Sequence, residues 1–177
     1  MEFNEVVKNR RSIRKYDTDK KVTREQVEEL IRYAIYAPTW KNSQTARYYC
    51  ALDGKGREAV ANCLQGTNKD KTEGAALIVA TFVKNRSGFD REGNPDNECG
   101  NGWGYYDLGL ASENICRAAK NMGLDSLIMG LRDGEKIRAF LSLPGNEQVV
   151  SVIAVGYAAE SPAKPARKAT GEVLKFI

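Results

Sequence analysis

Apolar and polar positions along the chain indicate helices and strands in mixed order. Apolar residues at helical spacing, with their flanking signals, predict helices over residues 3–10, 23–37, 57–64, 108–122 and 135–141. Short runs rich in β-branched and aromatic residues predict strands over residues 47–52, 75–83, 126–129 and 149–157. The run over 75–83, AALIVATFV, is continuously apolar, as in a strand buried on both faces. We therefore expect an α+β fold, formed as a single domain over residues 1–177.

Local signals set several boundaries of these elements. Thr23 and Gln26 have the spacing of a capping box, and Pro38 is expected to end the helix that follows. Gly123 is expected to end the long helix over 108–122. Residues 85–101 are polar and hold three glycines, which predicts a long loop of the kind that often serves function.

Composition removes several classes of chemistry. The chain has no histidine, which excludes a Ser-His-Asp triad, a Cys-His dyad and most zinc sites. Its four cysteines form no CxxC pair, so neither a zinc ribbon nor a thioredoxin site is predicted, and no metal is expected. The absence of an apolar leader or membrane-length stretch predicts a cytoplasmic protein without membrane contact. Any reaction that this protein catalyses must therefore depend on other side chains, on the backbone or on a bound cofactor.

Positive charge gathers near the two ends of the chain. The net charge is only +4, but basic residues crowd over 8–21 and again over 164–168. Acidic residues are interspersed elsewhere, which favours a small anionic ligand over a nucleic acid. A small nucleic-acid-binding domain that uses the first cluster electrostatically remains the alternative.

A glycine motif raises a second possibility. Gly54, Gly56 and Ala59 lie between a predicted strand and a predicted helix, as in a dinucleotide-binding fingerprint. The acidic residue that should end the next strand is missing, because that strand ends at Val83-Lys84. A glycine-rich turn is the favoured interpretation.

Two polar segments carry sharper signals. In an extended backbone, Arg10, Ser12 and Arg14 point the same way, so two guanidinium groups flank a hydroxyl in the manner of a phosphate clamp. Asn42 and Gln44 are also two residues apart and could present amides to the edge of a flat ring.

These segments resemble the motifs of the nitroreductase family of FMN-dependent oxidoreductases, and the resemblance runs over nearly the whole chain. Five segments carry the resemblance: RRSIRKY, APTWKNSQ, the helix from Asp107 to Gly123, SLIMGL and KPARK. The resemblance implies that the FMN phosphate and part of the ring are held by Arg10, Arg11, Ser12 and Arg14. It implies that the residues along the isoalloxazine ring are Pro38, Thr39, Asn42 and Gln44. The resemblance also implies that the backbone near flavin N5 and O4 is that of Met129, Gly130 and Leu131. It implies that the phosphate site is completed by Arg167 and Lys168.

The same resemblance implies the reaction and the assembly. NADH or NADPH would reduce FMN, and flavin N5 would pass the electrons to a nitroaromatic, quinone or similar small acceptor by a ping-pong mechanism. No side chain need be catalytic, although Arg14 or Lys41 could supply positive charge near N1 and O2. The implied fold is a mostly antiparallel sheet flanked by helices, in a homodimer that exchanges C-terminal tails and holds each flavin at the interface. A flavin-handling protein of this fold without NAD(P)H turnover is the alternative within the family.

Overall fold

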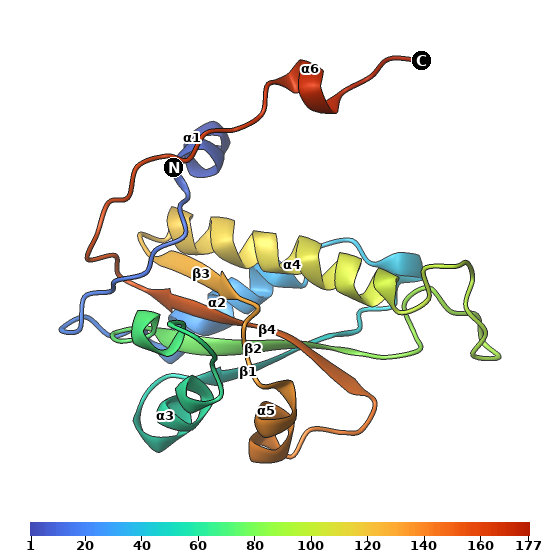
Figure 1. Ribbon diagram of the computed structural model, residues 1–177, viewed down its shortest axis with the longest axis horizontal. Helices are drawn as coiled ribbons and strands as arrows, with labels where there is room; N and C mark the ends of the chain where they lie inside the picture. Colours follow the sequence, from blue (N-terminus) through green and yellow to red (C-terminus); the bar gives the residue numbers. More distant parts are fainter.

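The computed structural model describes residues 1–177 and is built on a four-stranded sheet (Figure 1). The strands lie in the order β1-β2-β4-β3, and every neighbouring pair is antiparallel. Their bounds are β1 Ala46–Ala51, β2 Ala76–Val83, β3 Asp125–Met129 and β4 Glu147–Gly156. The predicted antiparallel α+β fold is thus confirmed. A dinucleotide fingerprint needs a parallel βαβ unit, so the glycine motif at Gly54 belongs to a turn and helix start instead.

Helices cover both faces of the sheet. Helices α2 (Arg24–Ala34) and α4 (Gly102–Asn121) pack on one face, while α3 (Gly54–Asn62) and α5 (Gly134–Leu141) lie on the other (Figure 1). Along β2, Leu77 points to the α3 side and Ile78 to the α2–α4 side, and neither is exposed to solvent. This two-sided burial explains the continuously apolar run predicted as a strand.

The capping box at the start of α2 is present. The Thr23 hydroxyl accepts a hydrogen bond from Gln26 N at 3.2 Å, and the Gln26 side chain accepts one from Thr23 N at 3.0 Å. The helix ends at Ala34, however, rather than beside Pro38. Ile35, which directly follows the helix, is 64% exposed. Tyr36, the next residue, is 77% exposed, so two large apolar side chains after α2 are left largely uncovered by this chain.

The long helix begins earlier than its apolar spacing indicated. It starts at Gly102 instead of residue 108, because its first turn packs on the sheet. Gly104 lies directly against the Phe82 ring, where any Cβ would overlap the ring carbons. Gly104, which precedes the predicted start of the helix, is thus a residue inside the helix that packing requires to be glycine.

The remaining elements are short. They are α1 (Phe3–Asn9), the 3-10 turns η1 (Trp40–Asn42) and η2 (Lys69–Lys71), and α6 (Thr170–Val173) in the tail. The predicted loop over 85–101 contains no helix or strand. None of the helices combines the length and the apolar character needed to cross a bilayer.

Candidate functional site

Four arginines surround a hollow of about 250 Å³, which we call the arginine pocket. Its polar lining consists of Arg10, Arg11, Ser12, Arg14 and Arg167. The first four follow α1 on an extended segment beside the edge strand β3, where Ile13 N donates to Ser126 O at 3.1 Å. The structure thus brings together both predicted parts of the phosphate site, which are more than 150 residues apart in sequence.

The C-terminal tail forms the opposite wall of the arginine pocket. Ala159 N donates to Lys15 O at 2.9 Å, and the Glu160 carboxylate accepts a hydrogen bond from Arg14 N. The tail then passes over the arginines with Pro162, Ala163 and Pro165. Arg167 arrives from this wall, whereas Lys168 does not line the pocket.

The guanidinium groups of the arginine pocket have no carboxylate partner. No ion pair involves any of the four arginines. Arg11 donates to the carbonyls of Lys8 and Arg10 at 2.7 Å each, and Arg14 donates to the Ser12 carbonyl at 3.1 Å. The Arg10 side chain makes no hydrogen bond within the chain. The pocket therefore concentrates four guanidinium groups that form no ion pair and have donors suited to a phosphate.

The second predicted cluster, Pro38–Gln44, lies elsewhere and is called the amide segment. It joins α2 to β1 and has an unusual backbone, since Lys41, Asn42 and Gln44 have φ values of 47°, 55° and 48°. Left-handed conformations of this kind cost roughly 1–2 kcal/mol for each residue other than glycine. They persist only where surrounding contacts fix them.

Contacts from three directions fix the amide segment. Thr39 Oγ1 accepts from Gln44 N at 3.1 Å, which closes the turn from within. Asp107 of α4, 4% exposed, accepts from Trp40 N at 3.0 Å and from the Ser87 hydroxyl. Asp96, from the loop over 85–101, accepts from the Trp40 indole and forms an ion pair with Lys41, both at 2.8 Å. The Lys41 hydrogen bond holds the pKa of Asp96 below its ordinary value.

The third predicted group begins at Met129, the last residue of β3, and continues past the strand. Met129 is buried in the core, whereas Leu131 is 64% exposed. The Leu131 carbonyl accepts from Gln65 N at 3.1 Å and from the Asn68 side chain at 3.2 Å, which fixes the backbone there. Gly130, between them, is exposed at the end of the same strand that flanks the arginine pocket.

The arginine pocket and the amide segment lie at opposite edges of the sheet. The pocket flanks β3 and the amide segment leads into β1, which are the two outer strands. Three strand spacings of about 4.8 Å separate these edges by about 14 Å. The amide segment also contacts the start of α4 through Asp107, whereas β3 follows the end of that helix (Figure 1). One chain therefore holds two halves of the predicted site without joining them.

Sequence reasoning missed the two carboxylates that hold the amide segment. Asp107 could have been found from its position. It lies four residues before Ala111, on the apolar stripe of α4, so it is a charged residue where a buried apolar one is expected. Asp96 had none, since it is one of several acids in a polar loop. Lys41, proposed as a source of charge for the flavin, is instead paired with Asp96 in this chain.

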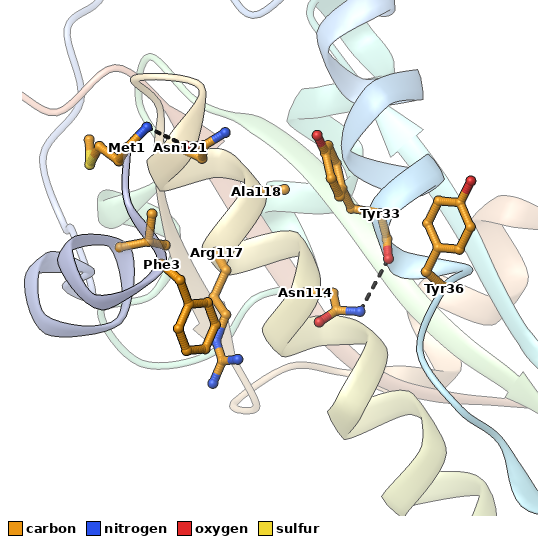
Figure 2. A pocket seen from close by; sticks show the side chains of 9 residues that line it. Met1, Phe3, Tyr33, Tyr36, Asn114, Arg117, Ala118 and Asn121 are labelled. Carbon is orange, nitrogen blue, oxygen red and sulfur yellow. Dashed lines mark hydrogen bonds between the residues drawn. The ribbon is translucent and has the colours of Figure 1, made fainter.

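A separate apolar groove of about 330 Å³ lies between α1, α2 and α4 (Figure 2). The Arg117 guanidinium carbon lies over the Phe3 ring, 5.6 Å from its centroid, and Asn114 donates to the Tyr33 carbonyl at 3.2 Å. Tyr36, on the α2 side, is 77% exposed. None of the predicted cofactor ligands lines this groove.

Comparison with known proteins decides the family. The model described as the nitroreductase family matches residues 7–157, most of the chain. This chain belongs to the nitroreductase family. The predicted family, its fold and its class, an oxidoreductase, are confirmed.

Individual relatives agree with this assignment. A Bacillus subtilis protein named FMN reductase (NAD(P)H) is 27% identical, over 93% of this chain and 70% of its own length. A solved nitroreductase family protein from Clostridium novyi NT is 25% identical with a TM-score of 0.76, covering 93% of this chain and 89% of that one. Another from Streptococcus pneumoniae TIGR4 has a TM-score of 0.85 at 20% identity, covering 99% and 100%.

Proposed function

We propose that this nitroreductase family member binds FMN and transfers electrons from NADH or NADPH to a small acceptor such as a nitroaromatic or a quinone. The arginine pocket is the observation that carries the proposal, because its four guanidinium groups line one hollow and none of them forms an ion pair. The name of the Bacillus subtilis relative supports the same cofactor and reductant. Residues 1–177 would act as one FMN-binding domain.

The arginine pocket fits the phosphate end of FMN. A phosphate monoester carries close to two negative charges and three acceptor oxygens, and each charge-assisted hydrogen bond contributes about 1.5–3 kcal/mol. Arg10 and Arg167 would bind these oxygens, with Ser12 as a further donor. The hollow of about 250 Å³ is below the range of roughly 300–1,000 Å³ for a complete ligand site, so the ring must lie outside it.

The protein's own task is to hold and orient the cofactor. When bound, FMN supplies the hydride and electron chemistry that the side chains of this chain lack. Gly130 and Leu131, at the end of the strand that flanks the arginine pocket, would place the backbone beside the ring. Asn42 and Gln44 would donate and accept hydrogen bonds at the ring's polar edge. Positive charge near flavin N1 and O2 is better supplied by Arg14 than by Lys41, because the Arg14 guanidinium forms no ion pair whereas Lys41 is paired with Asp96.

A homodimer would complete each site. Because the amide segment and the arginine pocket lie at opposite sheet edges, the amide segment that meets a given pocket would come from a second copy. Exposed apolar side chains supply the surface for such contact, including Phe3 and Tyr36 of the groove in Figure 2 and the neighbouring residue in sequence, Ile35. In the tail, Leu174 and Phe176 are 46% and 92% exposed, as expected of a segment that packs on a partner.

The visible absorption spectrum of the purified protein tests this proposal. A flavin spectrum that bleaches on anaerobic addition of NADH or NADPH would support both the cofactor and the reductant. A flavin spectrum that persists would favour a flavin-handling role without NAD(P)H turnover. A colourless protein that takes up no added FMN would overturn the proposal.

A further inference from the structure

The loop over 85–101 is attached to the amide segment through a compact set of contacts. Asp96 accepts hydrogen bonds from the Trp40 indole at 2.8 Å and from Lys41 at 2.8 and 2.9 Å. Only 17% of the Asp96 side chain is exposed, against 61% for Lys41. One carboxylate therefore restrains two adjacent side chains of the segment.

Asp96 is itself held by the loop and by α4. Its backbone N–H donates to Gly88 O at 2.8 Å, so the carboxylate sits at a fixed place in the loop. Trp103, in the first turn of α4, packs against Trp40 with ring centroids 4.2 Å apart and donates its indole N–H to Asn97 at 2.9 Å. The loop, the helix start and the amide segment form one connected unit.

This unit acts where the backbone of the amide segment is least favourable. Lys41 and Asn42 have left-handed φ values of 47° and 55°, directly after the residue whose side chain Asp96 holds. Asp107 and Thr39 restrain only backbone N–H groups of the segment. Without Asp96, the Trp40 indole and the Lys41 ammonium would have no carboxylate partner to hold them in place.

We propose that Asp96 is a positioning residue for the flavin ring, which acts by holding Trp40 and Lys41 so that Asn42 and Gln44 keep the conformation that meets the ring. This inference rests on the proposed function, because it assumes that the amide segment contacts FMN. The inference assigns a role to the loop over 85–101. The Asp96 carboxylate also neutralises the charge of Lys41.

Titration of the apoprotein with FMN and with riboflavin tests the proposal. Riboflavin has the ring but no phosphate, so loss of ring positioning should weaken both ligands by the same factor. We expect Asp96→Ala to raise both dissociation constants about tenfold, the effect of losing roughly 1.4 kcal/mol. Asp96→Asn, which keeps an acceptor for the Trp40 indole, should have a smaller effect, and Glu92→Ala removes an exposed acid of the same loop as the matched control.

Tryptophan signals show whether the unit has changed. The chain has only two tryptophans, Trp40 and Trp103, so near-ultraviolet circular dichroism reports directly on their packing. An altered signal in Asp96→Ala with unchanged affinity for both ligands would overturn the proposal, as would an equal loss in Glu92→Ala. If Asp96→Ala does not fold, Asp96→Asn decides the matter by the same two titrations. A wild-type protein that binds neither ligand would instead refute the proposed function.

Discussion

Arg10 is the arginine of the pocket with the most freedom to bind a ligand, because its side chain makes no hydrogen bond within the chain. Arg10→Ala should therefore remove a charge-assisted bond to phosphate without disturbing the fold. A loss of about 1.5–3 kcal/mol corresponds to roughly a tenfold to hundredfold weaker binding of FMN. Quenching of flavin fluorescence on titration of the apoprotein measures this change.

Riboflavin and a distant arginine provide the controls for Arg10→Ala. Riboflavin lacks the phosphate, so its affinity should be the same for Arg10→Ala and for the wild-type protein. Arg24→Ala removes a guanidinium on α2 that pairs only with Glu28 at 2.9 Å on the surface, and it should leave FMN binding unchanged. Equal weakening of FMN and riboflavin by Arg10→Ala would show that the phosphate lies elsewhere.

The sequence indicates a candidate binding residue only when its signal is local. Arg10, Ser12 and Arg14 are predictable because alternation in an extended segment places them on one side, and the structure brings them into one pocket. Asp96 meets Lys41 across 55 residues, so no spacing rule could connect them. The contact exists because the loop packs on the first turn of α4, which is a tertiary event.

At the scale of the elements, the start of α4 depends on Gly104. An alanine there would place its Cβ in overlap with carbon atoms of the Phe82 ring, and Phe82 is 1% exposed, packed in the core. Gly104→Ala should destabilise the protein by about 1–3 kcal/mol, as expected of overpacking in a filled core. Urea denaturation followed by far-ultraviolet circular dichroism measures the free energy of unfolding.

Gly56 is the matched control, since it occupies the same third position in α3 that Gly104 occupies in α4. Nothing lies within 4 Å of a Cβ built on Gly56. Alanine favours the helix by up to about 1 kcal/mol over glycine, so Gly56→Ala should be neutral or stabilising. If both variants behaved alike, backbone propensity rather than packing would explain the glycine at position 104.

The cap of α5 should make part of the stability depend on pH. Asp133 accepts a hydrogen bond from Lys136 N at 3.0 Å, and this bond lowers the pKa of Asp133 from its ordinary value of 3.8. A lowered pKa in the folded state stabilises the protein above the unfolded value, and this contribution is lost as the pH falls through the folded value. Asp133→Ala should therefore be less stable than the wild-type protein at pH 7, with the difference shrinking below pH 3.8.

Asp133→Asn separates the charge from the hydrogen bond. Asparagine is about as good an N-cap as aspartate but does not titrate in this range. Its advantage over alanine should therefore persist in acid, where that of the wild-type protein fades. Thermal unfolding of the three proteins from pH 7 to pH 2.5 gives the comparison. A wild-type advantage that is constant over this range would show that the charge of Asp133 does not contribute to the cap.

For the whole molecule, apolar periodicity predicts the fold better than the assembled site. The strands lie within two residues of their predicted bounds, because a buried strand must be apolar whatever surrounds it. The helix starts were missed by up to six residues where glycines and aromatics pack in ways that spacing does not encode. That the arginine pocket and the amide segment occupy opposite sheet edges follows from the strand order, which requires the three-dimensional structure.

That separation leads to a prediction about the proposed homodimer. If each FMN is held between the arginine pocket of one subunit and the amide segment of the other, two different binding-deficient variants should complement each other. Arg10→Ala combined with Arg14→Ala would disable the pocket, and Asn42→Ala combined with Gln44→Ala would disable the segment. A mixed dimer then has one site with both defects and one site with none.

Co-expression of the two double variants with different affinity tags isolates the mixed dimer. Each mixed dimer should bind one FMN, about half of the wild-type content, although neither parent binds FMN tightly. Dimers of each parent, purified in the same way, are the controls. If the flavin were held within one chain, every site of the mixed dimer would carry a defect, and no FMN would be recovered. The flavin content of the mixed dimer therefore distinguishes a site shared between subunits from one contained in a single chain.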